Sequence, residues 1–238
     1  MYGYRARIGY TSPPYLTETF PYEFYRMVPD GVTLVLTTLA IKRLTEEETG
    51  RSVAMTLEAA REMGRAGVDI VVFGGVPLNL SLGYDGLAET LRRTEDEIGV
   101  PVTSSVTAQV NALRAVGAER PALLHPFAEP GGFDTSYVAH YGFAPAGVRG
   151  AGRTVAELAT MPEAEIGRLA EALCRDCPGA DALYIPAPHW AVIGLIERLE
   201  RTLGIPVVTA IQAIVWEALR RSGVNDRIEG YGRLLRER

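Results

Sequence analysis

Three histidines and two cysteines are the side chains of this 238-residue chain best suited to acid–base or nucleophilic chemistry. His189 lies in DALYIPAPHW (181–190) and His125 in RPALLHPF (120–127), and each follows a run typical of a buried strand. Histidine has an unperturbed pKa of about 6.5, so it can donate or accept a proton near neutral pH. His189 and His125 are therefore the candidate catalytic residues, with a hydrogen bond to a strand-end backbone as the alternative. His140, in VAHYGF, is expected to end a helix and to have no chemical role.

The two cysteines form a CxxC motif, Cys174 to Cys177, in EALCRDCPGA. Such a motif can be a redox pair or half of a zinc site. A redox pair usually opens a helix, whereas this one closes a helix at the stop signal Pro178-Gly179. No second CxxC exists, and the histidines lack zinc-ligand spacing to it. We expect structural thiols and no metal site.

Strand-like runs alternate with amphipathic helical stretches, several of which end at glycine. This alternation predicts an α/β fold with a parallel sheet covered by helices on both faces. The predicted strands are RIGYTS (7–12), GVTLVLTT (31–38), DIVVFGG (69–75), PVTSS (101–105), RPALLH (120–125), GFAPAGVRG (142–150), DALYIP (181–186) and IPVVTA (205–210).

The chain also repeats itself. GVPVTSSVTAQVNALRAVGA from Gly99 aligns with GIPVVTAIQAIVWEALRRSG from Gly204, DIVVFGGVP with DALYIPAPH, and RIGYTSPP with RPALLHPF, at offsets of 105 to 113 residues. Three matches in the same order predict two pseudo-symmetric α/β halves, 1–117 and 118–220, with a tail, 221–238, that packs back on the first half.

Ligands of parallel sheets bind beyond the carboxyl ends of the strands, so a cleft between the two sets of strand ends is the expected site. Ser104 and Ser105 precede a helix, which they can cap, and its N-terminus can also receive a carboxylate. Aromatic residues at these ends can instead belong to the core, and Glu18 or Glu23 can supply a carboxylate base. The candidate binding residues are Ser12, Pro13, Pro14, Gly74, Gly75, Val76, Ser104, Ser105, Phe127, Ala187, Pro188 and Trp190.

Composition narrows the class of partner. A net charge of −5 gives no reason to expect nucleic acid or an anionic membrane, and no apolar run approaches the roughly 20 residues of a membrane span. The N-terminus MYGYRARIGY has no signal-peptide core. We expect a cytoplasmic protein that binds a small molecule and can form a homo-oligomer.

Four stretches resemble a known family: IGYTSPP, GVPVTSSVTAQVNALRAVGAER, LGIPVV and GYGRLL. Together they are similar to the aspartate/glutamate racemase superfamily, in the branch of arylmalonate decarboxylase and maleate cis-trans isomerase. The resemblance implies two pseudo-symmetric halves, a site between them, and no cofactor or metal. It also implies thiol chemistry: racemases and the isomerase carry a cysteine after the equivalent strand of each half, and the decarboxylase keeps only the second, as proton donor to an enediolate.

The matching positions lack these groups. The first cysteine position falls on Gly75 and the second on Ala187; Val76-Pro77 replaces a hydroxyl pair, and Phe127 replaces a tyrosine. We therefore predict a cofactor-independent isomerase or lyase that acts on a small carboxylic acid or carbonyl compound without cysteine. The alternatives are a non-catalytic small-molecule binder, or decayed homologue, and an enzyme that retains the thiol chemistry.

Overall fold

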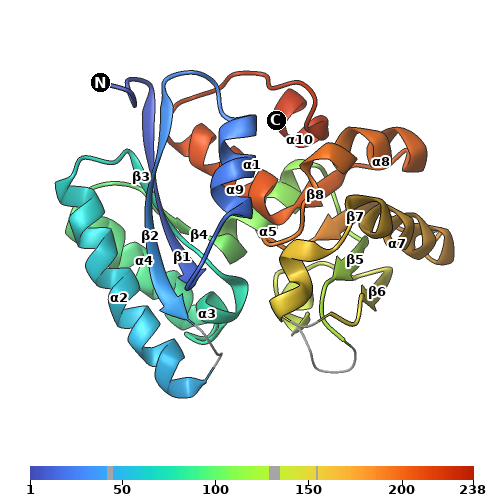
Figure 1. The fold of residues 1–238 in the computed structure, drawn as a ribbon, viewed down its shortest axis with the longest axis horizontal. Coiled ribbons are helices and arrows are strands. Elements are labelled where there is room, and N and C mark those ends of the chain that lie inside the picture. The colour runs from blue at the N-terminus through green and yellow to red at the C-terminus, as the bar shows by residue number, and fades with distance from the viewer. Residues whose placement is uncertain (42–44, 129–134, 154) are drawn as a thin grey trace.

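Two four-stranded parallel sheets form the framework of the computed structural model, which describes residues 1–41, 45–128, 135–153 and 155–238. The first sheet has the order β2-β1-β3-β4 and the second the order β6-β5-β7-β8, so the same topology occurs twice (Figure 1). The strands are β1 (Ala6–Pro14), β2 (Val32–Ile41), β3 (Ile70–Phe73), β4 (Val102–Ser104), β5 (Pro121–His125), β6 (Gly147–Gly150), β7 (Ala182–Ile185) and β8 (Val207–Thr209). All eight predicted strands and the doubled α/β fold are confirmed.

Helices fill the connections between the parallel strands. In the first half they are α1 (Thr19–Met27), α2 (Glu46–Arg65), α3 (Val76–Leu80), α4 (Tyr84–Ile98) and α5 (Ser105–Ala115). The remainder are α6 (Ser136–His140), α7 (Glu163–Asp176), α8 (Ile196–Leu203), α9 (Ala210–Arg221) and α10 (Gly232–Glu237), with short 3₁₀ turns η1 (Val155–Thr160) and η2 (Ile193–Leu195). His140 ends α6, as expected from the sequence.

Strand register shows that the two halves are equivalent residue by residue. Ile8 pairs with Ile70 in the first sheet, and Pro121 pairs with Ala182 in the second, which is the pairing that the aligned repeats require. Asp69 and Asp181 also act alike, because each carboxylate accepts a backbone N–H at the start of the neighbouring central strand, at 2.7 Å and 2.8 Å. The repeat therefore preserves side-chain functions as well as topology.

One helix of each half packs against the other half. Ile211, Ile214 and Val215 of α9 share a core cluster with Ile8 and Val72 of the first sheet. Conversely, α5 reaches the second half, where Gln109 Oε1 accepts a hydrogen bond from Tyr184 of β7 at 2.9 Å. This exchange fixes the strand ends of the two halves relative to each other.

The C-terminal tail contacts the first half. Asp226 forms an ion pair with Arg5 at 2.6 Å, and the Tyr231 hydroxyl donates to the carbonyl of Arg26 at 2.7 Å. The domain boundaries at 117/118 and 220/221 stay predictions. Among the described residues, no helix combines the length and apolarity needed to cross a bilayer.

Candidate functional site

The carboxyl end of β3 carries a turn that requires glycine in the first half. Gly75 has φ +82°, and a Cβ added there would overlap Pro13 Cγ. The N–H of Gly74 donates to the carbonyl of Thr11 at 3.0 Å, and that of Gly75 donates to Ser105 Oγ at 3.1 Å. This turn is therefore held against β1 and the start of α5, and its residue type is dictated by backbone geometry.

Replacement of Gly75 by alanine is expected to lower the free energy of unfolding by about 2–4 kcal/mol. Both the positive φ and the overlap of the new Cβ with Pro13 destabilise the folded variant. Gly50→Ala is the matched control: no atom lies within 4 Å of its added Cβ, and the site is an exposed helix interior, so a gain of about 0.5–1 kcal/mol is expected. Urea denaturation of both variants measures the difference. Equal stabilities of Gly75→Ala and the parent protein would contradict the assignment of strain.

Side chains of the protein accept most of the hydrogen bonds that the first backbone N–H groups of α5 can donate. Ser104 Oγ accepts the N–H of Thr107 at 3.0 Å, which confirms the expected cap. Asn79 Oδ1 accepts the N–H of Val106 at 3.3 Å, and the Tyr10 hydroxyl shares a hydrogen bond with Ser105. Burial raises the pKa of Tyr10 far above its usual value, so this hydroxyl stays protonated. Two of the first three helix N–H groups are thus already occupied, which weakens this terminus as a carboxylate site.

Sequence reasoning missed the part that Asn79 plays in this network. Asn79 is fully buried, and its amide also donates to the carbonyl of Gly74 at 3.4 Å. It therefore joins the glycine turn to α5. In the sequence, Asn79 stands out only as the first residue of an Asn-Leu-Ser glycosylation sequon, which gives no sign of a buried role.

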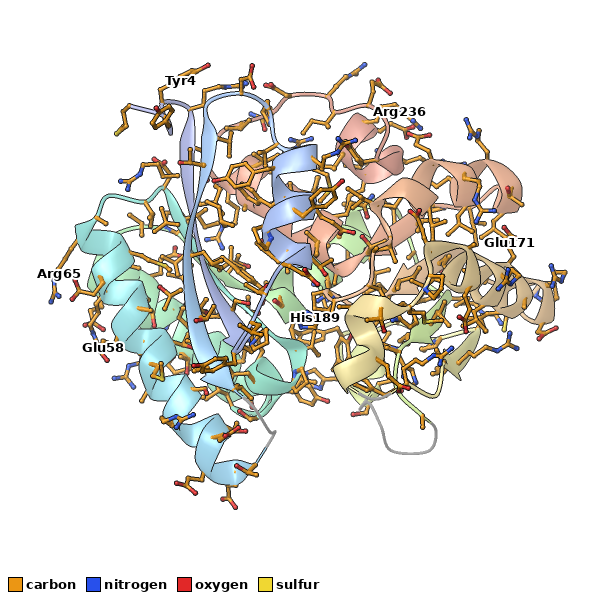
Figure 2. All side chains as sticks on the ribbon, viewed as in Figure 1. Tyr4, Glu58, Arg65, Glu171, His189 and Arg236 are labelled. Carbon is orange, nitrogen blue, oxygen red and sulfur yellow. The ribbon has the colours of Figure 1, made fainter. Side chains whose placement is uncertain are left out.

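The second half carries both candidate histidines at its carboxyl edge. His125 is the last residue of β5 and is 1% exposed, whereas His189 follows the end of β7 by four residues and is half-buried. Strands β5 and β7 are hydrogen-bonded neighbours, so the two residues lie on adjacent strands of one sheet. Both histidines thus come from the same half, and Figure 2 places His189 on the side that faces the first half.

Burial lowers the pKa of His189 below its ordinary value of 6.5. The imidazole is therefore neutral at pH 7, with one ring nitrogen able to accept a proton. A neutral imidazole suits the role of general base better than that of general acid.

The turn between β7 and η2 is compact. The N–H of Ala187 donates to the carbonyl of Ile185 at 2.9 Å, and that of Trp190 donates to the carbonyl of Ala187 at 3.2 Å. Ala187 is buried, and Trp190 is 0% exposed within a core cluster made only of residues of the second half. Phe127 is half-buried and packs against the same cluster. Pro188 is half-buried on the same turn.

The remaining predicted binding residues lie at the end of β1 and around the glycine turn. Ser12 is buried, and Pro13 and Pro14 are half-buried. Val76 is buried at the start of α3. The structure brings these residues to one edge of the first sheet; their roles as ligands stay predictions.

The CxxC motif lies beside the amino end of β6, not at the carboxyl ends of the strands. Cys174 and Cys177 are at the end of α7, where the Cys177 sulfur packs beside Gly147 of the edge strand β6. Burial, and the neighbouring Cys177 to a smaller extent, raise the pKa of Cys174 to about 11, so this thiol is not ionised at neutral pH. Among the described residues there is no group of three or more His, Cys, Asp or Glu that could hold a metal ion.

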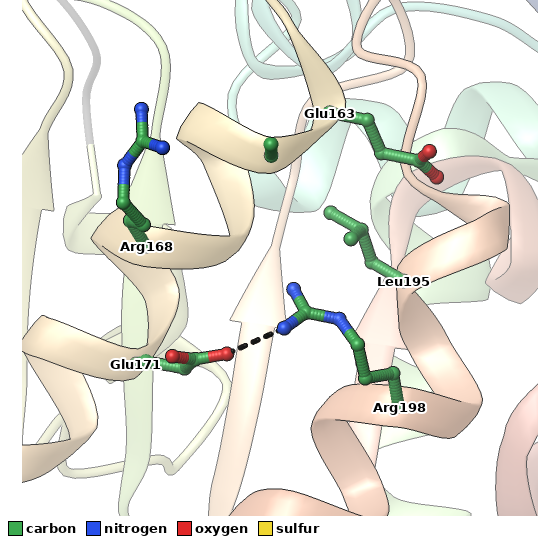
Figure 3. A pocket seen from close by; sticks show the side chains of 6 residues that line it. Glu163, Arg168, Glu171, Leu195 and Arg198 are labelled. Carbon is green, nitrogen blue, oxygen red and sulfur yellow. Dashed lines mark hydrogen bonds and ion pairs between the residues drawn. The ribbon is translucent and has the colours of Figure 1, made fainter.

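A separate hollow of about 360 Å³ lies between α7 and the η2–α8 segment (Figure 3). Arg198 forms an ion pair with Glu171 at 2.8 Å along its wall. The hollow contains none of the residues predicted from the strand ends. Its lining residues are Glu163, Ala164, Arg168, Glu171, Leu195 and Arg198.

Comparison with known proteins agrees with this architecture. The model of the arylmalonate decarboxylase family matches residues 8–235. The arylmalonate decarboxylase of Bordetella bronchiseptica is 27% identical over 233 residues, which cover 97% of this chain and 96% of that protein. The maleate isomerase of Nocardia farcinica is 33% identical over 141 residues, or 57% of this chain and 55% of that protein.

Solved structures give the same result. A crystal structure of arylmalonate decarboxylase superposes with a TM-score of 0.83 at 27% identity, covering 96% of this chain and 98% of that one. The maleate isomerase of Pseudomonas putida S16 shares the fold, with a TM-score of 0.87 at 21% identity over 98% of each chain. The chain therefore belongs to the arylmalonate decarboxylase family, in the branch of the aspartate/glutamate racemase superfamily that also includes maleate isomerase.

Proposed function

We propose that this protein is a cofactor-independent enzyme, an isomerase or lyase, that acts on a small carboxylic acid or carbonyl compound with His189 as its general base. The observation that carries the proposal is a half-buried, neutral imidazole just beyond the carboxyl end of β7. It lies two residues after Ala187, to which the resemblance assigns the second cysteine position. His125, at the end of the adjacent strand, is the second proton-transfer group.

The protonation state of His189 favours one reaction type. Abstraction of a proton next to a carboxyl or carbonyl group needs a base: the C–H bond breaks, its electron pair enters an enediolate or enolate, and the imidazole takes the proton. Decarboxylation instead leaves the pair on carbon when CO₂ departs and needs a proton donor afterwards. A neutral imidazole supports proton abstraction as the first step. Two histidines from one half also suit transfer on one face of the substrate better than racemisation.

Thiol chemistry receives no support from the position of the cysteines. A solved structure of the Nocardia farcinica maleate cis-trans isomerase contains a covalently bound succinylcysteine intermediate. In the present protein, Cys174 and Cys177 lie at the end of α7 beside β6.

The double variant Cys174→Ala/Cys177→Ala is expected to keep its kcat/KM within about twofold of the parent value, because neither thiol lies at the carboxyl ends of the strands. Iodoacetamide treatment of the parent protein should likewise leave activity unchanged. Steady-state kinetics before and after alkylation measure both effects. Loss of activity on either treatment, with an unchanged circular dichroism spectrum, would restore the thiol mechanism.

A panel of malonates, succinates, maleate and keto acids in D₂O tests the proposed function. Proton NMR follows deuterium incorporation next to the carboxyl or carbonyl group, together with isomerised or decarboxylated products. Incorporation with at least one member supports the enzyme. Saturable binding without exchange or product would favour the alternative, a small-molecule binder.

One observation weighs against that alternative. A cleft closed by large aromatic side chains would favour a binder or a decayed enzyme, whereas Trp190 packs in the core of the second half. We also propose that the ligand is a carboxylate, that the protein forms a homo-oligomer and that it is located in the cytoplasm.

A further inference from the structure

Glu23 is a buried carboxyl group that joins the two halves. It lies on α1 of the first half and is 1% exposed. Its Oε1 atom accepts the N–H of Val192 at 3.0 Å and that of Ile193 at 3.3 Å. Both donors belong to the second half, immediately after the turn that carries His189 and Trp190.

The second carboxyl oxygen of Glu23 has an unusual environment. Oε2 is buried and has no hydrogen-bond partner among the residues that the structure describes. A carboxylate in such a place carries a desolvation cost that two hydrogen bonds offset only in part. Burial raises the pKa of Glu23 to about 7, the two backbone donors oppose that rise, and Glu163 adds to it.

Glu163 is the charged neighbour on the other side of this contact. It begins α7 and is labelled in Figure 3. Its Oε1 atom lies beside Gly194 of η2, one residue after the second donor to Glu23. Two carboxyl groups therefore bracket η2, with Glu23 holding the backbone from the first half.

These contacts fix the segment between β7 and η2 at two places. Trp190 fixes its middle in the core of the second half, and Glu23 fixes its end from the first half. His189 lies directly before Trp190 and three residues before Val192. Glu23 thus holds, from the first half, one end of the segment whose other end carries the imidazole.

We propose that Glu23 is a positioning residue that holds the His189 turn in register with the first half through the N–H groups of Val192 and Ile193. This proposal rests on the proposed function only for its effect on turnover. The effect on the turn itself is independent of any reaction.

Two variants of Glu23 test the proposal, with Glu58→Gln as the matched control. Glu58 is an exposed glutamate on the outer face of α2 (Figure 2). Glu23→Gln keeps a side-chain oxygen acceptor, whereas Glu23→Leu removes it. We expect Glu23→Leu to speed amide hydrogen exchange at Val192 and Ile193 about tenfold or more and to shift the NMR titration of His189. At pH 5, where Glu23 is protonated, Glu23→Gln and Glu58→Gln should keep the parent values of amide exchange.

Turnover adds a second readout. For a substrate found with the panel, Glu23→Leu is expected to lower kcat about 10–100-fold with KM changed much less, since a displaced base acts on the chemical step. Glu23→Gln should restore most of that loss. Unaltered exchange and titration in Glu23→Leu overturn the proposal. Altered exchange and titration in a protein that turns over no substrate uphold the positioning role and refute the proposed function.

A measurement on well-folded protein covers the case in which Glu23→Leu fails to fold. Because the closed state holds the Glu23 proton more tightly than an open state, ionisation favours opening. Protection at Val192 and Ile193, corrected for the intrinsic pH dependence of exchange, should therefore fall as pH rises from 5 to 8 in the parent protein and stay level in Glu23→Gln. Amide exchange at Val192 and Ile193 as fast in the parent protein as at an exposed turn overturns the proposal.

Discussion

His189→Asn is expected to lower kcat/KM by about 10²–10⁴-fold, the usual contribution of a positioned general base. Asparagine retains a hydrogen-bonding side chain of similar size but cannot take up a proton. The loss should appear in kcat/KM for proton abstraction and equally in the rate of deuterium incorporation from D₂O. His125→Asn should also lower turnover if it transfers the second proton.

The pH profile of the parent enzyme provides an independent check. Burial lowers the pKa of His189, so the base form persists to a pH below 6.5, and kcat/KM should fall only as pH drops through that lowered pKa. The acid limb assigned to His189 should be absent from the residual activity of His189→Asn.

His140→Asn is the matched control for this prediction. His140 is exposed on α6 and stacks on Tyr84 with ring centroids 3.7 Å apart. Its replacement should change stability slightly and leave turnover and pH profile as they are. Full activity in both His189→Asn and His125→Asn would refute the two-histidine site.

The fold could be predicted from the sequence because its strands are buried on both faces. Runs such as IVVF in β3 and ALYI in β7 are wholly apolar, and parallel pairing under two layers of helices produces such runs. The internal repeat then fixed their order, since Gly99 and Gly204 both end a helix in the left-handed conformation before an equivalent strand. Local pattern and topology agreed at each of these positions.

The packing of α5 and α9 against the opposite halves could not be predicted in the same way. Apolar spacing shows which face of a helix is buried but not which sheet covers it. Local pattern does not predict α1, for a different reason. Its sequence, TFPYEFYRM, contains a proline and several aromatic residues, which lower helix propensity, and the stacking of Phe20 on Tyr10 at 3.7 Å stabilises it through tertiary contact.

The candidate site could be proposed from sequence at the level of strand ends and no further. Residues that follow parallel strands must meet at one edge, which placed His125, His189 and Gly75 correctly along the chain. The overlap of a Gly75 Cβ with Pro13, the core position of Trp190 and the contact of Glu23 with Val192 all depend on long-range packing. No local pattern carries that information.

The second large effect concerns Glu23 and the pH dependence of stability. Its pKa rises from 4.5 to about 7 on folding, chiefly through burial. Between these values the folded state binds a proton that the unfolded state has released, so protonation stabilises the fold. The stability that this group contributes is complete below about pH 4.5 and is lost as pH rises through about 7, a change of about 3 kcal/mol at most.

Glu23→Gln should remove that dependence, because an amide does not titrate and still offers an oxygen to Val192 and Ile193. The variant is expected to exceed the parent protein in free energy of unfolding at pH 8, with the difference shrinking toward pH 5. Urea denaturation at pH 5, 6, 7 and 8 measures this difference.

Two other buried carboxyl groups also titrate. Burial raises the pKa of Glu200 and that of Glu217, so the stability curve of the parent protein contains their pH dependence as well. The difference between parent and variant cancels those shared slopes, and Glu58→Gln should reproduce the parent curve. Parallel curves for the parent and Glu23→Gln would show that Glu23 is ionised in the folded protein at every pH tested, and would leave the contact between the halves as an ordinary carboxylate–backbone hydrogen bond.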